Sequence, residues 1–474
     1  MKYGLLITLV ALLSACGGDP DGSMGSSSAL PDSVTFAEHI APIVHTNCVP
    51  CHRPGQAGPF SLITYADVRR KAKTIKKVTG AGYMPPWPAD TGYSHFLGER
   101  VLSQRDIALI AKWVDQGAVQ GDPGSMVAFD MNVIAGGLGK PDAIVWIPDA
   151  FAIPGDARDR FVITKAPFAL ERDTFLRAIE FVPGNRRAVH HMNGALINYA
   201  TDAKADPFLG AAYLDAEQVE GVDAFAWLQL QNDDGTWPAL VPSAINYLPG
   251  MAPVQYPEGI GGLRLSAQGA FLLNTLHYGP SSRDTSDRSH FNLYFAPRAP
   301  ERPLRELFLG STHTAIEPPL HLEPGDVKTF HTELELQEDI SVLSINPHMH
   351  LLGTRFVTYA VTPANDTVPL VRINDWDFRW QYTYTFPRML PLMRGTVIHV
   401  EGTFDNSTDN PQQAFDPPRA ITGTDSKLMR TTDEMLQFFV NYVDYRNGDE
   451  RISLAPTAPA PPLRALSDGA ATMR

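Results

Sequence analysis

Residues 378–386 read Phe-Arg-Trp-Gln-Tyr-Thr-Tyr-Thr-Phe, with an aromatic ring at every second position. Successive side chains of a β-strand point to opposite faces of a sheet, so this alternation predicts a strand with one buried face. Similar pieces occur between Gly, Pro, Asn and Asp turns at 175–182, 291–295 and 395–404. Short strands of this kind, without intervening helices, predict two antiparallel, jelly-roll-like β-sandwich domains, at 141–300 and 301–452.

The overall composition limits the class of protein. At roughly 150 residues per domain, a chain of 474 residues is long enough for about three domains. The formal net charge of −13 is spread over residues of both signs, and nucleic-acid binding needs a basic face, so we expect no nucleic-acid partner. The last residues, 453–474, are rich in Ala and Pro and are predicted to be a disordered tail.

The N-terminus has the features of an export signal. An apolar run follows Lys2, is too short to span a bilayer, and ends in Leu13-Ser14-Ala15-Cys16. This ending resembles the lipobox of bacterial lipoproteins, which implies a signal peptide at residues 1–16 that ends at Cys16, with Cys16 as the lipidated first residue of the mature protein. The alternative is an ordinary signal peptide with a chance cysteine. Residues 17–33 are Gly/Ser-rich and predict a flexible tether. We therefore expect an exported, membrane-anchored lipoprotein facing the periplasm or cell surface, as in a Gram-negative bacterium.

The sequence Cys48-Val49-Pro50-Cys51-His52 matches the haem c attachment pattern C-x-x-C-H. The two thiols add to the porphyrin vinyl groups, and the imidazole that follows ligates the iron. A redox dithiol is the alternative, but His52 completes the haem pattern. The chain has only three cysteines, so lipidation and haem attachment leave none for a disulfide.

Two helices are predicted around this motif. Apolar residues recur at helical intervals in 36–51, and 102–118 opens with a capping-box-like Ser103-x-x-Asp106. A helical pair around a haem resembles cytochromes c, which predicts a small all-α cytochrome c-like domain at 34–125. Met84, in the proline-rich loop between the helices, is the predicted sixth iron ligand. The alternatives are His45, His95, or a Met84 that only fills space in the loop.

Histidines gather at three places in the predicted β region: His190-His191, His277 and His348-Met349-His350. Residues i and i+2 of a strand share a face, so His348 and His350 can chelate one metal ion. The adjacent His190 and His191 point to opposite faces of a regular strand, and joint ligation requires a bend or a bulge. Taken alone, His277 is more typical of a structural histidine.

These motifs together resemble the copper type II, ascorbate-dependent monooxygenases. The resemblance covers about residues 142–448 and rests on four runs in the order and approximate spacing of that family: Ala188-Val189-His190-His191-Met192, Leu276-His277-Tyr278-Gly279, His348-Met349-His350-Leu351-Leu352-Gly353 and Thr431-Thr432-Asp433-Glu434-Met435. It implies one copper ion bound by His190, His191 and His277, and a second, catalytic copper ion bound by His348, His350 and Met435.

The resemblance also implies the chemistry. The copper with the methionine ligand activates O₂ and takes hydrogen from a carbon of a small organic substrate, and the three-histidine copper supplies the second electron. Ascorbate, a periplasmic electron donor or the haem on the same chain is the expected electron source. Peptide-amidating members clamp a carboxylate with an arginine and a tyrosine where this chain has Asn346 and Phe439. Peptide amidation is therefore disfavoured, and the substrate stays open.

Two other functions compete with the monooxygenase. One is a non-catalytic copper-binding or electron-transfer lipoprotein, which would bind copper without consuming O₂. The other is a cytochrome with adhesive β-sandwiches, in which the histidines are structural. Histidines outside the motifs, His331 and His399 among them, are interpreted as structural or surface residues.

Overall fold

The computed structural model describes residues 29–126, 138–215, 223–311, 313–423 and 431–456. The predicted signal segment with Cys16, most of the tether and the tail beyond residue 456 lie outside these ranges. No helix within them is long and apolar enough to cross a membrane.

The predicted fold class is wrong. We expected a small all-α cytochrome c-like domain followed by two β-sandwich domains, but the chain is mostly β, with 37% strand and 12% helix in an arrangement of small sheets. The N-terminal helices form no separate all-α domain, because the segment between them joins the C-terminal sheets. There Ala89 forms a β-bridge with Ile373, and Leu97 N donates to Thr385 O at 2.8 Å. Phe96 is buried in the core of the same sheets.

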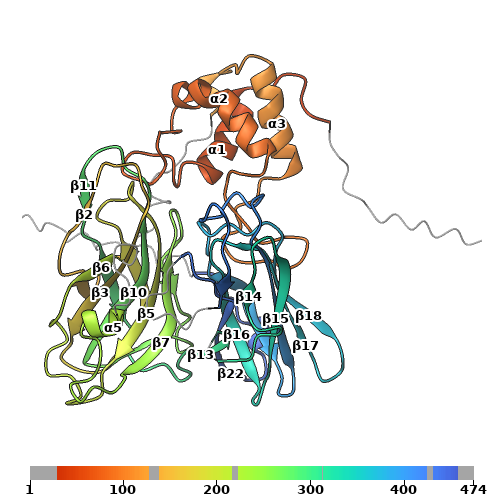
Figure 1. Ribbon diagram of the computed structural model, residues 1–474. Coiled ribbons are helices and arrows are strands. Elements are labelled where there is room, and N and C mark those ends of the chain that lie inside the picture. The colour runs from red at the N-terminus through yellow and green to blue at the C-terminus, as the bar shows by residue number, and fades with distance from the viewer. Residues whose placement is uncertain (1–28, 127–137, 216–222, 312, 424–430, 457–474) are drawn as a thin grey trace, which may run out of the picture.

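The N-terminal helices lie over one end of the β structure (Figure 1). They are η1 (Phe36–Ile40, a π-helix), α1 (Ala41–Asn47), α2 (Tyr65–Gly80) and α3 (Gln104–Asp115). The predicted capping box at Ser103 is confirmed, since its side chain and that of Asp106 cap each other's backbone N–H groups. Helix α2, which opens with the same motif at Thr64 and Asp67, is not among the predicted helices.

The first group of strands forms two five-stranded antiparallel sheets that share a core. One sheet contains β1 (Ala143–Trp146), β12 (His290–Phe295), β4 (Thr174–Val182), β8 (Val254–Gln255) and β9 (Arg264–Leu265). The other has the order β6 (Tyr213–Asp215), β3 (Arg160–Ala169), β10 (Gln268–Tyr278), β5 (Val189–Asn198) and β7 (Ala239–Tyr247). Phe271 of β10 stacks on Phe291 of β12 with ring centroids 4.5 Å apart, so apolar burial holds the sheets together. A short pair, β2 (Phe151–Ile153) and β11 (Thr285–Asp287), and helix α5 (Ala224–Trp227) complete this group.

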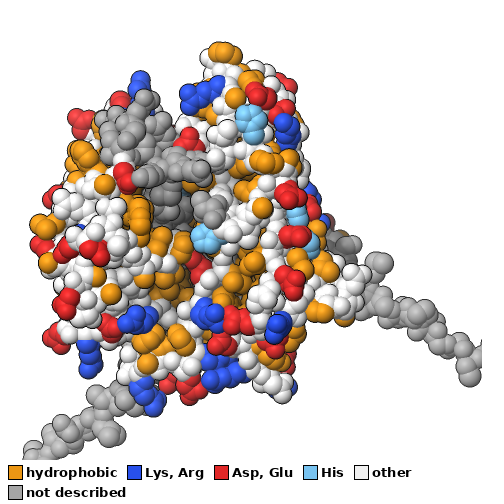
Figure 2. All heavy atoms as spheres, turned by 60° about the horizontal axis from the view of Figure 1, so that its bottom comes forward, with side chains coloured by type: hydrophobic (Ala, Val, Ile, Leu, Met, Phe, Trp, Pro, Cys, Tyr) orange, Lys and Arg blue, Asp and Glu red, His pale blue; other side chains and the backbone are white. Residues whose placement is uncertain are grey.

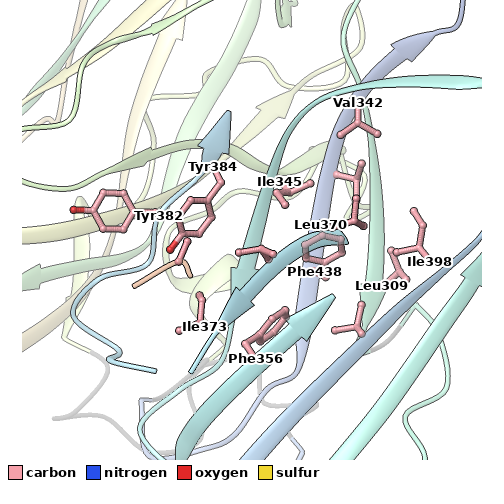
Figure 3. Packing of buried hydrophobic residues seen from close by; sticks show 14 of the residues in the cluster. Leu309, Val342, Ile345, Phe356, Leu370, Ile373, Tyr382, Tyr384, Ile398 and Phe438 are labelled. Atoms are coloured by element: carbon pink, nitrogen blue, oxygen red, sulfur yellow. The ribbon is translucent and has the colours of Figure 1, made fainter. Parts of the chain in front are cut away.

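The second group has two four-stranded antiparallel sheets around another core. One sheet has the order β13 (Arg305–Gly310), β22 (Gln437–Asp444), β16 (Ile340–His348) and β19 (Tyr384–Leu392). The other has the order β15 (Val327–Glu335), β20 (Val397–Asp405), β17 (Gly353–Val361) and β18 (Thr367–Ile373). Figure 3 shows Phe438 and Phe356 between the strands, and their ring centroids are 6.2 Å apart. The short strands β14 (His321–Leu322) and β21 (Ile421–Thr422) pair beside these sheets.

The predicted strands have mixed outcomes. The strands at 175–182 and 291–295 are confirmed as β4 and β12, and the one at 395–404 corresponds to β20. The strand predicted at 378–386 is wrong in its first part, because 378–383 is turn and irregular chain and β19 begins only at Tyr384.

The two groups of strands lie side by side, yellow-green and blue in Figure 1, and contact each other through polar side chains. Asn246 Nδ2 of β7 donates to Thr383 Oγ1 at 2.9 Å, and Asn193 Nδ2 of β5 donates to Gln381 Oε1 at 3.1 Å. On the face shown in Figure 2, basic and acidic side chains are interspersed. The irregular segment 378–383 therefore lies where the two groups meet.

Candidate metal centres

Three of the predicted histidines come together on two neighbouring strands. His277 of β10 is the register partner of His191 of β5, whereas Tyr278 pairs with Val189. His190 is thus the extra residue of a β-bulge, the irregularity that joint ligation by adjacent histidines requires. One ring nitrogen from each of the three histidines lies within 4.8 Å of the others. We call this group the three-histidine cluster.

Burial keeps two histidines of this cluster, His190 and His191, neutral. It lowers the pKa of His190 to about 4 and that of His191 well below the ordinary value. Within the described part of the chain, the buried His190 Nδ1 and His191 Nε2 have no hydrogen-bond partner. Because an unpaired buried polar atom is costly, and a neutral imidazole nitrogen binds transition metals, this donor set fits a metal ion.

His277 is oriented by a carboxylate. Its Nε2 donates to Asp159 Oδ1 at 2.6 Å, and its Nδ1 lies 3.3 Å from His191 Nδ1. This hydrogen bond lowers the pKa of Asp159, which therefore stays ionised. Metal-binding histidines commonly donate their second ring nitrogen to such a carboxylate, which fixes the tautomer. Phe161 stacks on the His277 ring at 4.4 Å and holds its plane.

The second group of predicted ligands lies where β16 ends. The rings of His348 and His350 are 5.0 Å apart and nearly perpendicular. His348 Nδ1 donates to Gln381 Oε1 at 2.6 Å, and His350 Nδ1 donates to Asp433 O at 2.8 Å. With each Nδ1 protonated toward an oxygen, each Nε2 carries the lone pair that can bind a metal. Burial lowers the pKa of His348 to about 3, so this imidazole is neutral.

Met435 is buried, and the residue before it, Glu434, is hydrogen-bonded to the backbone beside the two histidines. The Glu434 carboxylate accepts hydrogen bonds from His350 N at 3.1 Å and Leu352 N at 2.6 Å. Together with the bond from His350 to Asp433 O, these contacts hold the segment carrying Met435 against the His348–His350 turn. We call His348, His350 and Met435 the His/Met cluster.

The irregular segment 378–381 lies between the two clusters. Phe378 meets His191 and His350 edge-on, with ring centroids 5.3 Å and 5.7 Å away. Gln381 bonds both His348 and Asn193, and its Nε2 donates to Phe378 O at 2.8 Å, which fixes the orientation of its amide. Neither role is predicted from the sequence, because both residues belong to the stretch predicted as a regular strand.

The predicted haem residues line one cavity of about 380 Å³. Its walls contain Cys48, Cys51, His52 and Met84, together with His190 and Trp380 from the β structure. Trp380 also packs on His190, with ring centroids 5.4 Å apart. This cavity therefore reaches from the C-x-x-C-H motif to the three-histidine cluster.

The structure indicates the protonation states of two residues of the C-x-x-C-H motif. His52 Nδ1 donates to Phe60 O at 3.2 Å, which leaves the lone pair on Nε2, and burial lowers the pKa of His52. Burial raises the pKa of Cys48 to about 12, so its thiol stays protonated. The alternative iron ligands are elsewhere: neither His45 nor His95 lines this cavity, and His95 is exposed beside Glu99.

The two residues at the carboxylate-clamp positions have other roles here. Asn346 Nδ2 donates to Tyr382 O at 2.9 Å, and Phe439 stacks on Phe308 at 4.6 Å. Neither side chain can carry a positive charge.

Comparison with known proteins identifies one region. Residues 313–453 match the family model "Copper type II ascorbate-dependent monooxygenase, C-terminal domain". The matched residues include the whole His/Met cluster, and the match supports a copper monooxygenase function in general, with copper and ascorbate implied by the family. No curated protein matches the chain.

Two solved structures that resemble the chain do so only weakly. The major capsid protein P2 of bacteriophage PM2 is 9% identical, with coverage of 65% of this chain and 99% of that one and a TM-score of 0.21. The VP2 subviral particle of infectious bursal disease virus is 8% identical, with coverage of 66% and 74% and a TM-score of 0.17. Neither similarity informs the fold or the function.

Proposed function

We propose that this protein is a copper-dependent monooxygenase that hydroxylates a C–H bond of a small organic substrate with O₂. The observation that carries the proposal is the pair of histidine clusters on either side of Phe378, one of them inside the region of the family match. Burial keeps His190, His191 and His348 neutral. Met435 is buried on the segment that bonds to His350. Imidazole suits copper in both oxidation states, whereas a thioether favours Cu(I).

In this proposal His190, His191 and His277 hold one copper ion, and His348, His350 and Met435 hold the other. Copper bound there would supply O₂ activation at the His/Met cluster and one-electron transfer at the three-histidine cluster. The work of the protein is orientation: Asp159, Gln381 and the Asp433 carbonyl each fix an imidazole tautomer. Phe378 fills the space between the clusters with an apolar ring.

The electron source is the finer part of the proposal. Cys48 and Cys51 would attach haem c, and His52 and Met84 would hold its iron. Electrons would come from ascorbate, a periplasmic electron donor or through this haem. The support is that His190 lines the same cavity as the attachment residues. The export signal and a lipid anchor on Cys16 belong to the same proposal and place the protein at the periplasm or cell surface.

The test is O₂ uptake by the copper-loaded chain with ascorbate and a panel of amines, phenethyl compounds and peptides. Substrate-stimulated uptake is expected, with its loss in His350→Ala. His321→Ala is the matched control, because His321 lies on β14 and pairs with Glu323, outside both clusters. Two bound coppers without substrate-stimulated uptake would overturn the proposal and favour the copper-binding, electron-transfer alternative.

The haem part has its own tests. The ferric protein should show the weak near-infrared band of methionine-ligated haem, and Met84→Ala should lose it while covalent attachment persists. Anaerobic stopped-flow mixing of reduced haem with oxidised copper should show haem reoxidation that depends on copper. A ferric haem without that band rejects Met84, and reoxidation that is independent of copper rejects the electron route through the haem.

A further inference from the structure

A second kind of histidine cluster lies on the sheet of β15, β20, β17 and β18, away from both candidate copper clusters. It consists of His331 and Glu333 of β15 and His399 of β20. Glu333 is the direct register partner of His399, and His331 precedes Glu333 by two residues. Phe330, Thr332, Ile398 and Val400, which alternate with these residues, are buried. The three side chains therefore share the face of the sheet opposite its core.

The three ligand atoms of this group lie about as far apart as the corners of one coordination tetrahedron. His331 Nε2 is 3.1 Å from His399 Nδ1, His399 Nδ1 is 3.2 Å from Glu333 Oε2, and His331 Nε2 is 3.9 Å from Glu333 Oε2. A tetrahedral zinc ion with bonds of about 2.0–2.1 Å holds its ligand atoms about 3.3 Å apart. The three distances are therefore close to those between the ligand atoms of one tetrahedral ion.

The neighbouring side chains hold this arrangement in place. Tyr359 of β17 stacks on His399 with ring centroids 4.9 Å apart and an interplanar angle of 18°, and its hydroxyl donates to Glu401 Oε1 at 3.3 Å. On the other side, His331 and Glu317 exchange two backbone hydrogen bonds of 2.8 Å. Stacking on Tyr359 thus orients the imidazole of His399, and the backbone bonds fix the main chain at His331, which lowers the entropic cost of binding.

A histidine–glutamate pair elsewhere in the chain shows what is distinctive here. His321 and Glu323 have the same i, i+2 spacing, and His321 Nε2 lies 2.9 Å from Glu323 Oε1. That pair belongs to none of the three-ligand groups among the described residues, whereas His331 and Glu333 are joined by His399 from the adjacent strand. The converging third ligand is what makes a chelating site rather than a surface ion pair.

We propose that His331, Glu333 and His399 form a third metal site that binds a divalent transition-metal ion of the Zn²⁺ class, with water as the fourth ligand. Two imidazoles and one carboxylate are borderline and hard donors, which suit Zn²⁺ and contain no group that favours Cu(I). β15 is an edge strand of its sheet, so the ion ties this edge to β20. The site has a structural role and does not depend on the monooxygenase proposal.

The test is a zinc titration of the full chain, against a chromophoric chelator, after the copper clusters have been filled with Cu(I). The wild-type protein is expected to bind one zinc ion per chain and to gain thermal stability from it. Glu333→Gln keeps the side-chain shape and should weaken zinc binding at least about tenfold, since even outer-shell partners of a metal cost about 10–100-fold. His399→Phe keeps a ring against Tyr359 and should weaken zinc binding to a similar extent.

His321→Ala is the matched control and should bind zinc like the wild type. With Co²⁺ in place of Zn²⁺, the wild type should show the visible absorption of a tetrahedral cobalt site, and Glu333→Gln should lose it. Equal zinc affinity and thermal shift in the wild type, Glu333→Gln and His399→Phe would overturn the proposal. If His399→Phe unfolds, Glu333→Gln decides alone.

Discussion

Asp159 offers the sharpest test of the three-histidine cluster, because it can be changed without touching a proposed ligand. Its carboxylate accepts a 2.6 Å hydrogen bond from His277 Nε2, while its own side chain is half exposed. Asp159→Asn keeps an oxygen that can accept this bond but removes the negative charge. Asp159→Ala removes the acceptor altogether and leaves the ring of His277, which is 97% buried, without its partner.

The expected magnitude follows from the role of such partners. Loss of an outer-shell carboxylate costs about 10–100-fold in metal affinity, which corresponds to about 1.4–2.7 kcal/mol. Charge-assisted hydrogen bonds are roughly twice as strong as neutral ones, so Asp159→Asn should fall near the tenfold end and Asp159→Ala near the hundredfold end. The His/Met cluster has its own hydrogen-bond partners, and its copper affinity should be unchanged.

The assay is a copper titration in competition with a chelator, which resolves the two classes of site by their affinities. Asp156→Asn is the matched control, because Asp156 lies three residues earlier and pairs with Arg160 and Arg158 N instead of a histidine. Copper binding by Asp159→Ala that is as tight as in the wild type would refute the idea that this carboxylate orients a metal ligand.

Three further predictions concern the other elements of the site. Gln381→Leu removes the acceptor of His348 Nδ1 and should weaken Cu(I) binding at the His/Met cluster about 10–100-fold in a chelator competition, with the three-histidine cluster unaffected; equal binding would contradict the assigned tautomer. The metal-free protein should lose stability as the pH falls from about 6.5 to about 4, because an unfolded histidine takes up a proton there while buried His190, with a pKa of about 4, does not. Denaturant unfolding should show this slope, up to about 1.4 kcal/mol per pH unit for each such group, and His190→Gln should reduce it by the share of one group; an unchanged slope would contradict the burial argument. Gly58→Ala should reduce covalent haem attachment, measured by absorbance, since its Cβ would lie 2.7 Å from Cys51 O; Gly80→Ala, which has open space, should not, and equal attachment in both would refute this.

Local patterns in the sequence predicted only part of this fold. The strands at 175–182 and 291–295 were predictable because each packs one face on a shared core, which leaves an alternation that periodicity detects. Helix α2 was overlooked although Thr64 and Asp67 form its capping box and Val68, Ala72 and Ile75 face inward. Its many lysines and arginines obscured this apolar stripe, which covers one narrow face.

The candidate ligands were predictable as a set, whereas the residues that orient them were not. Asp159 and His277 are 118 positions apart in sequence, and Asn193 and Gln381 are 188 apart. Such pairs leave no local pattern, because their relationship exists only after the sheets have formed. The prediction of a separate cytochrome-like domain was wrong for the same reason. Phe96 resembles any apolar loop residue, and nothing near it in sequence indicates that it is buried in the C-terminal core.

The aromatic stretch 378–386 shows what a period of two does and does not indicate. Four of its five aromatic side chains are buried and Trp380 is partly buried, and they lie in two different environments. Tyr384 and Phe386 pack in a regular strand, whereas Phe378 lies between the histidine clusters and the ring of Tyr382 packs on Trp87 at 5.2 Å. The Tyr382 hydroxyl donates to Pro86 O at 2.9 Å and thereby ties the loop that carries Met84 to this segment. The alternation therefore indicates burial but not a strand. An irregular segment that lies beside a cavity and between two histidine clusters buries aromatic side chains as well.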